Sequence, residues 1–163
     1  MEDKNPHHEL TTTLHLGLRS VVDSSPSALI ETLIEQSSIE EQGIISEILQ
    51  GSGERAMVFI HRGPSRGARF LITGEGATIG RSPASEIFLD DVTVSRSHAA
   101  IKREGNGFIF TDSGSLNGSY INNQQSSHHR LTNGDEIQIG KFHMLFISST
   151  TNSTSSSNEL GEK

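Results

Sequence analysis

One loop of this sequence gathers the residue types that bind a phosphoryl group. Residues 90–98 carry two acids, a Ser-Arg-Ser run and His98, and short apolar segments flank them on both sides. Arg81 lies upstream, and the run Gly-Ser-Leu-Asn-Gly at 114–118 lies downstream. A phosphorylated threonine offers nearly two negative charges and three acceptor oxygens. An arginine fork, a serine hydroxyl and an asparagine amide are donors suited to it and to the peptide backbone beside it.

The same loop admits a second chemistry. Ser95 and His98, with Asp90 or Asp91, can be interpreted as a hydrolase triad. Ser95 lacks a Gly-x-Ser-x-Gly elbow, however, and no oxyanion loop is evident. The glycine-rich run at 74–80 does not match a dinucleotide-binding loop either, because its last gap is one residue too long and no helix pattern follows. We therefore predict a structural role for His98, no cofactor and no enzymatic activity.

Charge is distributed unevenly along the chain. Residues 1–54 carry 2 basic and 10 acidic side chains, a net charge of −8, whereas residues 55–147 carry 10 basic and 8 acidic, a net charge of +2. An acidic arm on a slightly basic body argues against nucleic acid as the main partner. It also makes attraction between the arm and the body conceivable.

The composition excludes several other classes of protein. There are no cysteines, so disulfides and thiolate chemistry are ruled out. No apolar run approaches the roughly 18 residues of a membrane span, and the N-terminus lacks a signal-peptide pattern. His7 and His8 have no acidic or thiol neighbours at metal-ligand spacing, so we expect no metal site. We expect a soluble, cytoplasmic, monomeric protein with no membrane partner.

Three segments follow from the pattern. Residues 1–54 form an arm, within which 26–50 show the apolar spacing of one or two short amphipathic helices. These helices could dock on the body or bind a partner, and the sequence leaves both open. Residues 148–163 contain almost nothing apolar and should be disordered. From 55 to 147, short β-type runs alternate with turns such as Asn-Gly, which predicts an all-β, antiparallel β-sandwich.

The predicted strands all lie within this third segment. They are 56–62, 69–73, 77–79, 86–89, 98–103, 107–112, 119–121, 136–139 and 142–147.

Gly80-Arg81, Ser95-x-x-His98 and Asn117-Gly118, in this order, resemble the forkhead-associated (FHA) domain, which binds phosphothreonine. The resemblance implies a β-sandwich with its binding loops at one end. It implies that the ligand contacts are Arg81, Ser95, Arg96 and Asn117. It also implies that the residues supporting the loops are Gly80, His98, Ser115 and Gly118.

Longer runs at 62–71, 87–96, 114–118 and 133–142 resemble one group of FHA proteins, the small actinobacterial regulators GarA and OdhI. Unphosphorylated members of this group inhibit the E1 component of 2-oxoglutarate dehydrogenase and affect glutamate metabolism, which implies glutamate dehydrogenase and glutamate synthase as further partners. Ser/Thr protein kinases phosphorylate a threonine pair in the arm of this group, which matches Thr11-Thr12 or Thr12-Thr13 here, and the FHA domain then captures its own arm. In this chain the resemblance implies Thr12 as the acceptor, with Thr11 and Thr13 as the next choices.

An ordinary FHA adaptor that recruits phosphothreonine-containing proteins or kinases is the alternative. The two hypotheses differ in whether the unphosphorylated protein inhibits 2-oxoglutarate dehydrogenase, and the first also requires the arm to reach the loops. From Thr12 to the first predicted strand at Ala56 there are 44 residues. A flexible chain of that length has a root-mean-square span of about 35–40 Å, enough to reach around a small domain.

Overall fold

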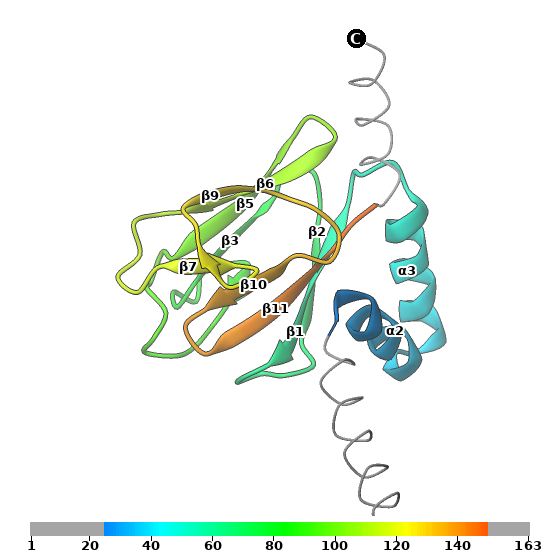
Figure 1. The fold of residues 1–163 in the computed structure, drawn as a ribbon, viewed down its shortest axis with the longest axis horizontal. Helices are drawn as coiled ribbons and strands as arrows, with labels where there is room; N and C mark the ends of the chain where they lie inside the picture. The colour runs from blue at the N-terminus through cyan, green and yellow to red at the C-terminus, as the bar shows by residue number, and fades with distance from the viewer. Residues whose placement is uncertain (1–24, 150–163) are drawn as a thin grey trace, which may run out of the picture.

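Two β-sheets pack face to face in the computed structural model, which describes residues 25–149 (Figure 1). The first sheet has the strand order β2-β1-β11-β10-β7-β8, and the second has the order β4-β3-β5-β6-β9. Neighbouring strands are antiparallel, except that β3 and β4 pair in parallel. The β-sandwich predicted from the sequence is therefore confirmed.

The strands of the first sheet are β1 (Ala56–Arg62), β2 (Arg69–Ile72), β7 (Ser119–Ile121), β8 (Gln124–Gln125), β10 (Glu136–Ile139) and β11 (Phe142–Ile147). Those of the second sheet are β3 (Ala77–Gly80), β4 (Ile87–Phe88), β5 (Ala99–Glu104), β6 (Gly107–Asp112) and β9 (His128–Leu131).

Alternation along β1 shows how the sequence builds two layers at once. Val58 and Ile60 point into the core between the sheets, where Phe108 and Phe146 meet edge to face with ring centroids 6.0 Å apart. Met57 and Phe59 point to the opposite face, yet they are buried too. Strand β1 is therefore apolar on both faces, because something covers its outer side.

Two helices provide that cover, α2 (Pro26–Gln36) and α3 (Ile39–Gln50). The Ser25 side chain caps α2, and Pro26 occupies its first turn, where a missing N–H costs nothing. At α3, Ser38 and Glu41 form a reciprocal capping box. Within residues 25–149, no helix is long and apolar enough to cross a membrane.

The helix pair is docked on the outer face of the first sheet (Figure 1). Leu33, Ile45 and Ile48 are buried against a patch of β1 and β11 that includes Met57 and Leu145. Each fully buried aliphatic side chain contributes about 1.5–3 kcal/mol. The sequence left open whether the helices of residues 26–50 dock on the body or bind a partner, and in the structure they are docked on the body.

Polar contacts fix the orientation of the helices on the sheet. The Arg69 guanidinium of β2 donates to the Ser37 hydroxyl at 2.7 Å and to the Glu41 carboxylate, and it lies 5.7 Å from the centre of the Phe59 ring. At the other end of α2, Pro26 lies against Gly134, where an added Cβ would be 3.2 Å from the proline Cβ. Helix α2 therefore crosses the sheet from the start of β10 to β2.

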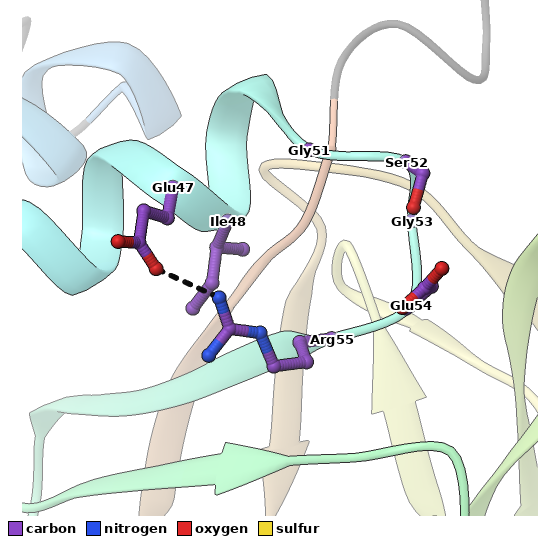
Figure 2. Close-up of a pocket in the computed structure, with 7 residues that line it drawn as sticks. All are labelled: Glu47, Ile48, Gly51, Ser52, Gly53, Glu54 and Arg55. Carbon is purple, nitrogen blue, oxygen red and sulfur yellow. Dashed lines mark hydrogen bonds and ion pairs between the residues drawn. The ribbon is translucent and has the colours of Figure 1, made fainter.

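The connection from α3 to β1 turns back sharply at Gly51–Gly53, as Figure 2 shows. Glu47 and Arg55 form an ion pair across it at 2.9 Å, and the Ser149 hydroxyl donates to the Gly51 carbonyl at 2.6 Å. Both side chains of the ion pair are exposed, so it adds at most about 1 kcal/mol. The turn keeps α3 next to the ends of β1 and β11.

Two features of the sheets differ from the sequence prediction. Strands β8 and β9 were not predicted, because Gln124–Gln125 and His128–Arg130 lack apolar residues at alternate positions. Strand β9 is nevertheless paired along β6 and buries only Leu131. The parallel pairing of β4 with β3 was not predicted either, since the sequence pattern carries no information about strand direction.

Candidate functional site

The loop from 90 to 98, between β4 and β5, is fixed mainly through its backbone. The Asp91 carboxylate accepts from the Thr93 backbone N–H at 2.9 Å and from the Thr93 hydroxyl. The hydrogen bonds from the Thr93 hydroxyl and N–H lower the pKa of Asp91. The Ser95 carbonyl accepts from the Arg81 N–H at 2.9 Å, which ties the loop to the end of β3. Ser95 and Arg81 are thereby brought side by side.

His98 lies beneath the loop and is completely buried. Its Nδ1 accepts from the Ser95 backbone N–H at 3.0 Å, which assigns the ring proton to Nε2. Nε2 donates to the Gly118 carbonyl, also at 3.0 Å, so the imidazole joins the two loops. The Ser95 hydroxyl accepts from the Leu116 N–H instead. This geometry gives no support to a hydrolase triad, because neither ring nitrogen contacts the Ser95 hydroxyl.

Asp112, at the end of β6, organises the second loop, residues 113–118. Its carboxylate accepts from the backbone N–H of Gly114 and Ser115 at 2.8 and 2.7 Å, and from the hydroxyls of Ser115 and Ser119 at 2.6 Å each. Burial alone would raise the pKa of Asp112, but the bonds from Ser115, Ser119 and Gly114 outweigh it, and the pKa is lowered. Ser115 in turn accepts from the Gly118 N–H at 2.9 Å.

The two loops enclose an open groove of about 320 Å³, which we call the loop groove. It is lined by Arg81, Val92, Thr93, Val94, Ser95, Arg96, Leu116 and Asn117. All four residues expected to contact phosphothreonine therefore line one groove. Their role as ligand contacts stays a prediction, but the chain does bring them together.

Three of these four side chains make one hydrogen bond to the loops and keep the rest of their hydrogen-bonding capacity for a ligand. Arg81 uses Nε to donate to the Val94 carbonyl at 3.0 Å, which aims the guanidinium and leaves its terminal amino groups. Ser95 accepts from Leu116 and retains its own O–H as a donor. Asn117 donates to the Thr93 carbonyl at 3.0 Å and retains its amide oxygen. The groove therefore presents donors to an anion.

Gly80 supports the groove by the absence of a side chain. A Cβ at this position would lie 2.1 Å from the Arg96 carbonyl oxygen, so only glycine allows the loop to approach β3 this closely. At Gly118 the backbone has a φ of +81°, a conformation that other residues rarely adopt. Together with His98 and Ser115, these residues lie directly beneath or within the two loops.

Some residues of the site were missed by the sequence analysis, and others lie outside the described part of the chain. Asp112 was not singled out, although an Asp directly before Ser-Gly-Ser is a signal for a turn in which the carboxylate accepts from the backbone. The exposed Val92 and Leu116 were missed as well. The predicted phosphoacceptors Thr11, Thr12 and Thr13 lie outside residues 25–149.

A smaller hollow in this part of the chain lacks comparable chemistry. The hollow at the α3–β1 turn, drawn in Figure 2, has a volume of about 110 Å³, and its Glu47 and Arg55 neutralise each other. Among residues 25–149, no group of three or more His, Cys, Asp or Glu side chains could hold a metal ion. The loop groove is therefore the candidate site.

Comparison with known proteins agrees with this site. Residues 77–140 match the FHA domain family model. The chain is 39% identical over 137 residues to the oxoglutarate dehydrogenase inhibitor of Corynebacterium jeikeium (strain K411), covering 76% of this chain and 95% of that protein. It is 44% identical over 117 residues to the glycogen accumulation regulator GarA of Mycolicibacterium smegmatis, covering 72% of this chain and 74% of GarA.

One solved structure, from an analysis of phosphothreonine-dependent FHA domain interactions, matches with a TM-score of 0.53 and 25% identity. The match covers 57% of this chain and 95% of that one. The chain therefore belongs to the family of FHA-domain regulators that includes the oxoglutarate dehydrogenase inhibitor of Corynebacterium jeikeium and GarA.

Proposed function

We propose that this protein binds and inhibits 2-oxoglutarate dehydrogenase when unphosphorylated, and that phosphorylation of its arm ends the inhibition. The observation that carries the proposal is the convergence of Arg81, Ser95, Arg96 and Asn117 on one groove. Support for the target comes from a relative that is itself named an oxoglutarate dehydrogenase inhibitor. A role of this kind would be carried out in the cytoplasm.

The groove suits a phosphothreonine for electrostatic reasons. Among residues 25–149, the Arg96 guanidinium forms no ion pair, and neither do the terminal amino groups of Arg81. A phosphoryl group carries about −1.5 to −2 charges and can accept from both arginines and from the Ser95 hydroxyl at once. Asn117 lines the same groove, and we expect its amide to bind the peptide backbone next to the phosphothreonine.

The proposed target is the E1 component of the dehydrogenase, and glutamate dehydrogenase and glutamate synthase are proposed as further partners. We propose that these enzymes bind the loop end without any phosphate. Ser/Thr protein kinases act upstream by modifying the arm, with Thr12 as the first choice of acceptor and Thr11 or Thr13 next. The phosphorylated arm then occupies the loop groove of its own molecule and excludes the enzymes.

The docked helices shorten the tether for this capture. Because α2 begins at Pro26, only 14 residues separate it from Thr12, whereas the sequence estimate counted 44 up to β1. Pro26, at the start of α2, lies against Gly134. At the other end of β10, Gly140 lies against Thr93 of the loop groove, since a Cβ added to Gly140 would be 2.2 Å from the Thr93 hydroxyl oxygen. From Gly134 to Gly140 there are six residue steps, which extend about 20 Å along β10.

This span matches the reach of the shortened arm. A flexible chain of 14 residues has a root-mean-square length of about 19–22 Å. Effective concentration is greatest when the tether length matches the span, and it is then about millimolar. If the free phosphopeptide binds at about 10 μM, closure is favoured by about 2.7 kcal/mol. The closed form would therefore dominate after phosphorylation.

The proposal is tested by treating the purified protein with a Ser/Thr kinase and recording NMR spectra at several protein concentrations. We expect the resonances of Arg81, Ser95 and Asn117 to shift by amounts that do not depend on concentration, and inhibition of the dehydrogenase to disappear. The variants Thr11→Ala, Thr12→Ala and Thr13→Ala are treated with the kinase in the same way, and the variant that shows no shifts identifies the acceptor. Shifts that grow with concentration would indicate capture between molecules, and a lack of inhibition by the unphosphorylated protein would leave the adaptor function.

A further inference from the structure

An open hollow lies between helix α2 and the outer face of the first sheet, beside the turn from β1 to β2. Its volume is about 350 Å³, and we call it the helix hollow. It is lined by Leu29 and Thr32 of α2, by Phe59 and His61 of β1, and by Arg66 of the turn. None of these residues lines the loop groove, so the two are separate surfaces.

The helix hollow leaves apolar surface that the docking of α2 does not cover. Leu29 is only partly buried, although it packs against the same apolar cluster as Leu33. Phe59 lines the hollow and carries the Arg69 guanidinium 5.7 Å from the centre of its ring. A short apolar segment laid along α2 would cover Leu29 and Phe59, which is favourable in proportion to the apolar area removed from water.

The charges around the hollow favour an anion. Arg69 is paired with Glu41, and His61 forms a hydrogen bond with Glu136 at 3.0 Å. Arg66, in contrast, forms no ion pair with any other residue of 25–149. The residues that line the hollow, all of them within this range, include no acid. An apolar segment that ends in a carboxylate therefore complements the hollow.

The chain itself supplies such a segment at the point where the described structure begins. Residues 1–24 precede Ser25, the N-cap of α2, and the run at 21–24 is Val-Val-Asp-Ser. Leu29 lies three residues beyond Pro26, or about 4.5 Å along the helix axis. Only two serines separate Asp23 from the helix. A segment tethered this closely has an effective concentration of about millimolar, so even a weak contact holds it.

We infer that Val21, Val22 and Asp23 fold back along α2 into the helix hollow of the unphosphorylated protein. The two valines cover the apolar side chains of α2 and β1, and the Asp23 carboxylate pairs with Arg66. The inference does not rest on the proposed function, because it involves neither a phosphoryl group nor the loop groove.

This contact determines where the free part of the arm begins. Gly63 follows β1 directly and lies against Lys141, since an added Cβ would be 2.1 Å from the Lys141 carbonyl oxygen. The neighbouring Gly140 lies against Thr93 of the loop groove. The helix hollow is therefore on the side of α2 that leads to the loop end of the sandwich. An arm held in the hollow starts near that end, instead of at Pro26.

The test compares NMR spectra of the full-length, unphosphorylated protein with those of variants in the arm. In Val21→Ser/Val22→Ser we expect the amide resonances of Leu29, His61 and Gly67 to shift, because the valines no longer cover the hollow. These three residues are too far from the substitutions in sequence to respond to them directly. The spectra are recorded at several protein concentrations.

The matched control is Leu16→Ser/Leu18→Ser, which removes two apolar side chains from the same arm but outside the docked segment. It should leave the resonances of Leu29, His61 and Gly67 at their wild-type positions.

A charge exchange tests the proposed ion pair. Asp23→Arg alone should shift the resonances of Leu29 and Thr32, because it places like charges together. The double variant Asp23→Arg/Arg66→Asp restores a pair of opposite charges, so both resonances should return toward their wild-type positions.

Three results would overturn the inference. Unchanged resonances in Val21→Ser/Val22→Ser would mean that the hollow is open to another partner. Shifts that depend on protein concentration would mean that the arm of a second molecule occupies it. Equal shifts in the leucine control would mean that the arm makes apolar contacts without a preferred segment.

Discussion

At the loop end of the sandwich, buried polar groups hold the backbone in place, whereas on the helix-covered face the contacts are mostly between apolar side chains. His98 makes two hydrogen bonds that link the two loops, and Asp112 accepts four that fix the second loop. On the other face, Leu33, Ile45 and Ile48 pack against β1 and β11. The two regions are built from different interactions although they share the strands between them.

The difference follows from what each region has to do. Hydrogen bonds depend on direction as well as distance, so they fix atoms at the positions that a ligand requires. Apolar burial is roughly proportional to area and has no direction, so it attaches the helices without constraining their polar side chains. We therefore expect changes at the two regions to separate into effects on binding and effects on docking.

The largest effect should come from Leu33→Ala on the helix-covered face. Removing this fully buried side chain leaves a cavity and should lower the free energy of unfolding by about 2–5 kcal/mol, measured in urea. The Kd of a phosphothreonine peptide should not change. Ile39→Ala is the control, since Ile39 is exposed and its loss should be nearly neutral. An equal destabilisation by both variants would show that the helices are not docked by this contact.

His98→Ala should destabilise the loop end and also change its geometry. The substitution leaves the buried N–H of Ser95 and the carbonyl of Gly118 without their partner, which should cost about 1–3 kcal/mol of stability. Phosphopeptide affinity should fall as well, because Ser95 is no longer fixed. If the variant is less stable but binds the peptide with wild-type affinity, the position that His98 gives to Ser95 does not matter for binding. That result would contradict the view that the hydrogen bonds at the loop end serve ligand binding.

Arg81→Ala should affect binding alone. It removes a charge-assisted donor worth about 1.5–3 kcal/mol, so the Kd for a phosphothreonine peptide should rise roughly ten- to hundredfold. The melting temperature should stay close to that of wild type. Ser95→Ala should act in the same way and should also impair inhibition of the dehydrogenase. Arg66→Ala, an exposed arginine near α2, is the control for a general loss of positive charge.

The smallest effect we expect is a change in acid sensitivity caused by Asp112→Asn. The folded-state pKa of Asp112 lies below its ordinary value of 3.8, so its ionised form contributes stability that is complete above pH 3.8. That contribution is lost as the pH falls below 3.8 and through the lower folded-state pKa. Melting temperatures of wild type should therefore fall more steeply than those of the variant over this range. Parallel curves would mean that the carboxylate charge does not stabilise the loop.

Much of the fold could be predicted because the relevant signals are local. The runs at 56–62 and 107–112 are apolar and bounded by glycine or charged residues, and the structure places β1 and β6 at these positions. Strand β9 could not be found in this way, because its polar residues are ordered by pairing with β6 rather than by burial. Strand pairing depends on the whole fold, so a short stretch of sequence carries little information about it.

The site divides in the same way. Arg81, Ser95, Arg96 and Asn117 could be predicted as ligand contacts because the motifs that contain them resemble the FHA domain and their side chains are donors suited to an anion. Asp112 was missed although the sequence carries a signal for its turn, an Asp directly before Ser-Gly-Ser. The two further hydrogen bonds, from the Ser115 and Ser119 hydroxyls, exist only once the turn at 113–118 has formed. The docking of α2 and α3 on the first sheet could not be predicted either. An amphipathic pattern shows that one face of a helix is buried, but not which surface covers it.

The strands at the four edges of the two sheets have a consequence for how the protein behaves at high concentration. These strands, β2, β8, β4 and β9, contain only four, two, two and four residues. Short edges offer little unpaired backbone to a strand of another molecule, so edge-to-edge association is disfavoured. The protein should therefore resist edge-to-edge aggregation at high concentration, and its short edge strands are poor sites for a partner that binds by adding a strand to a sheet.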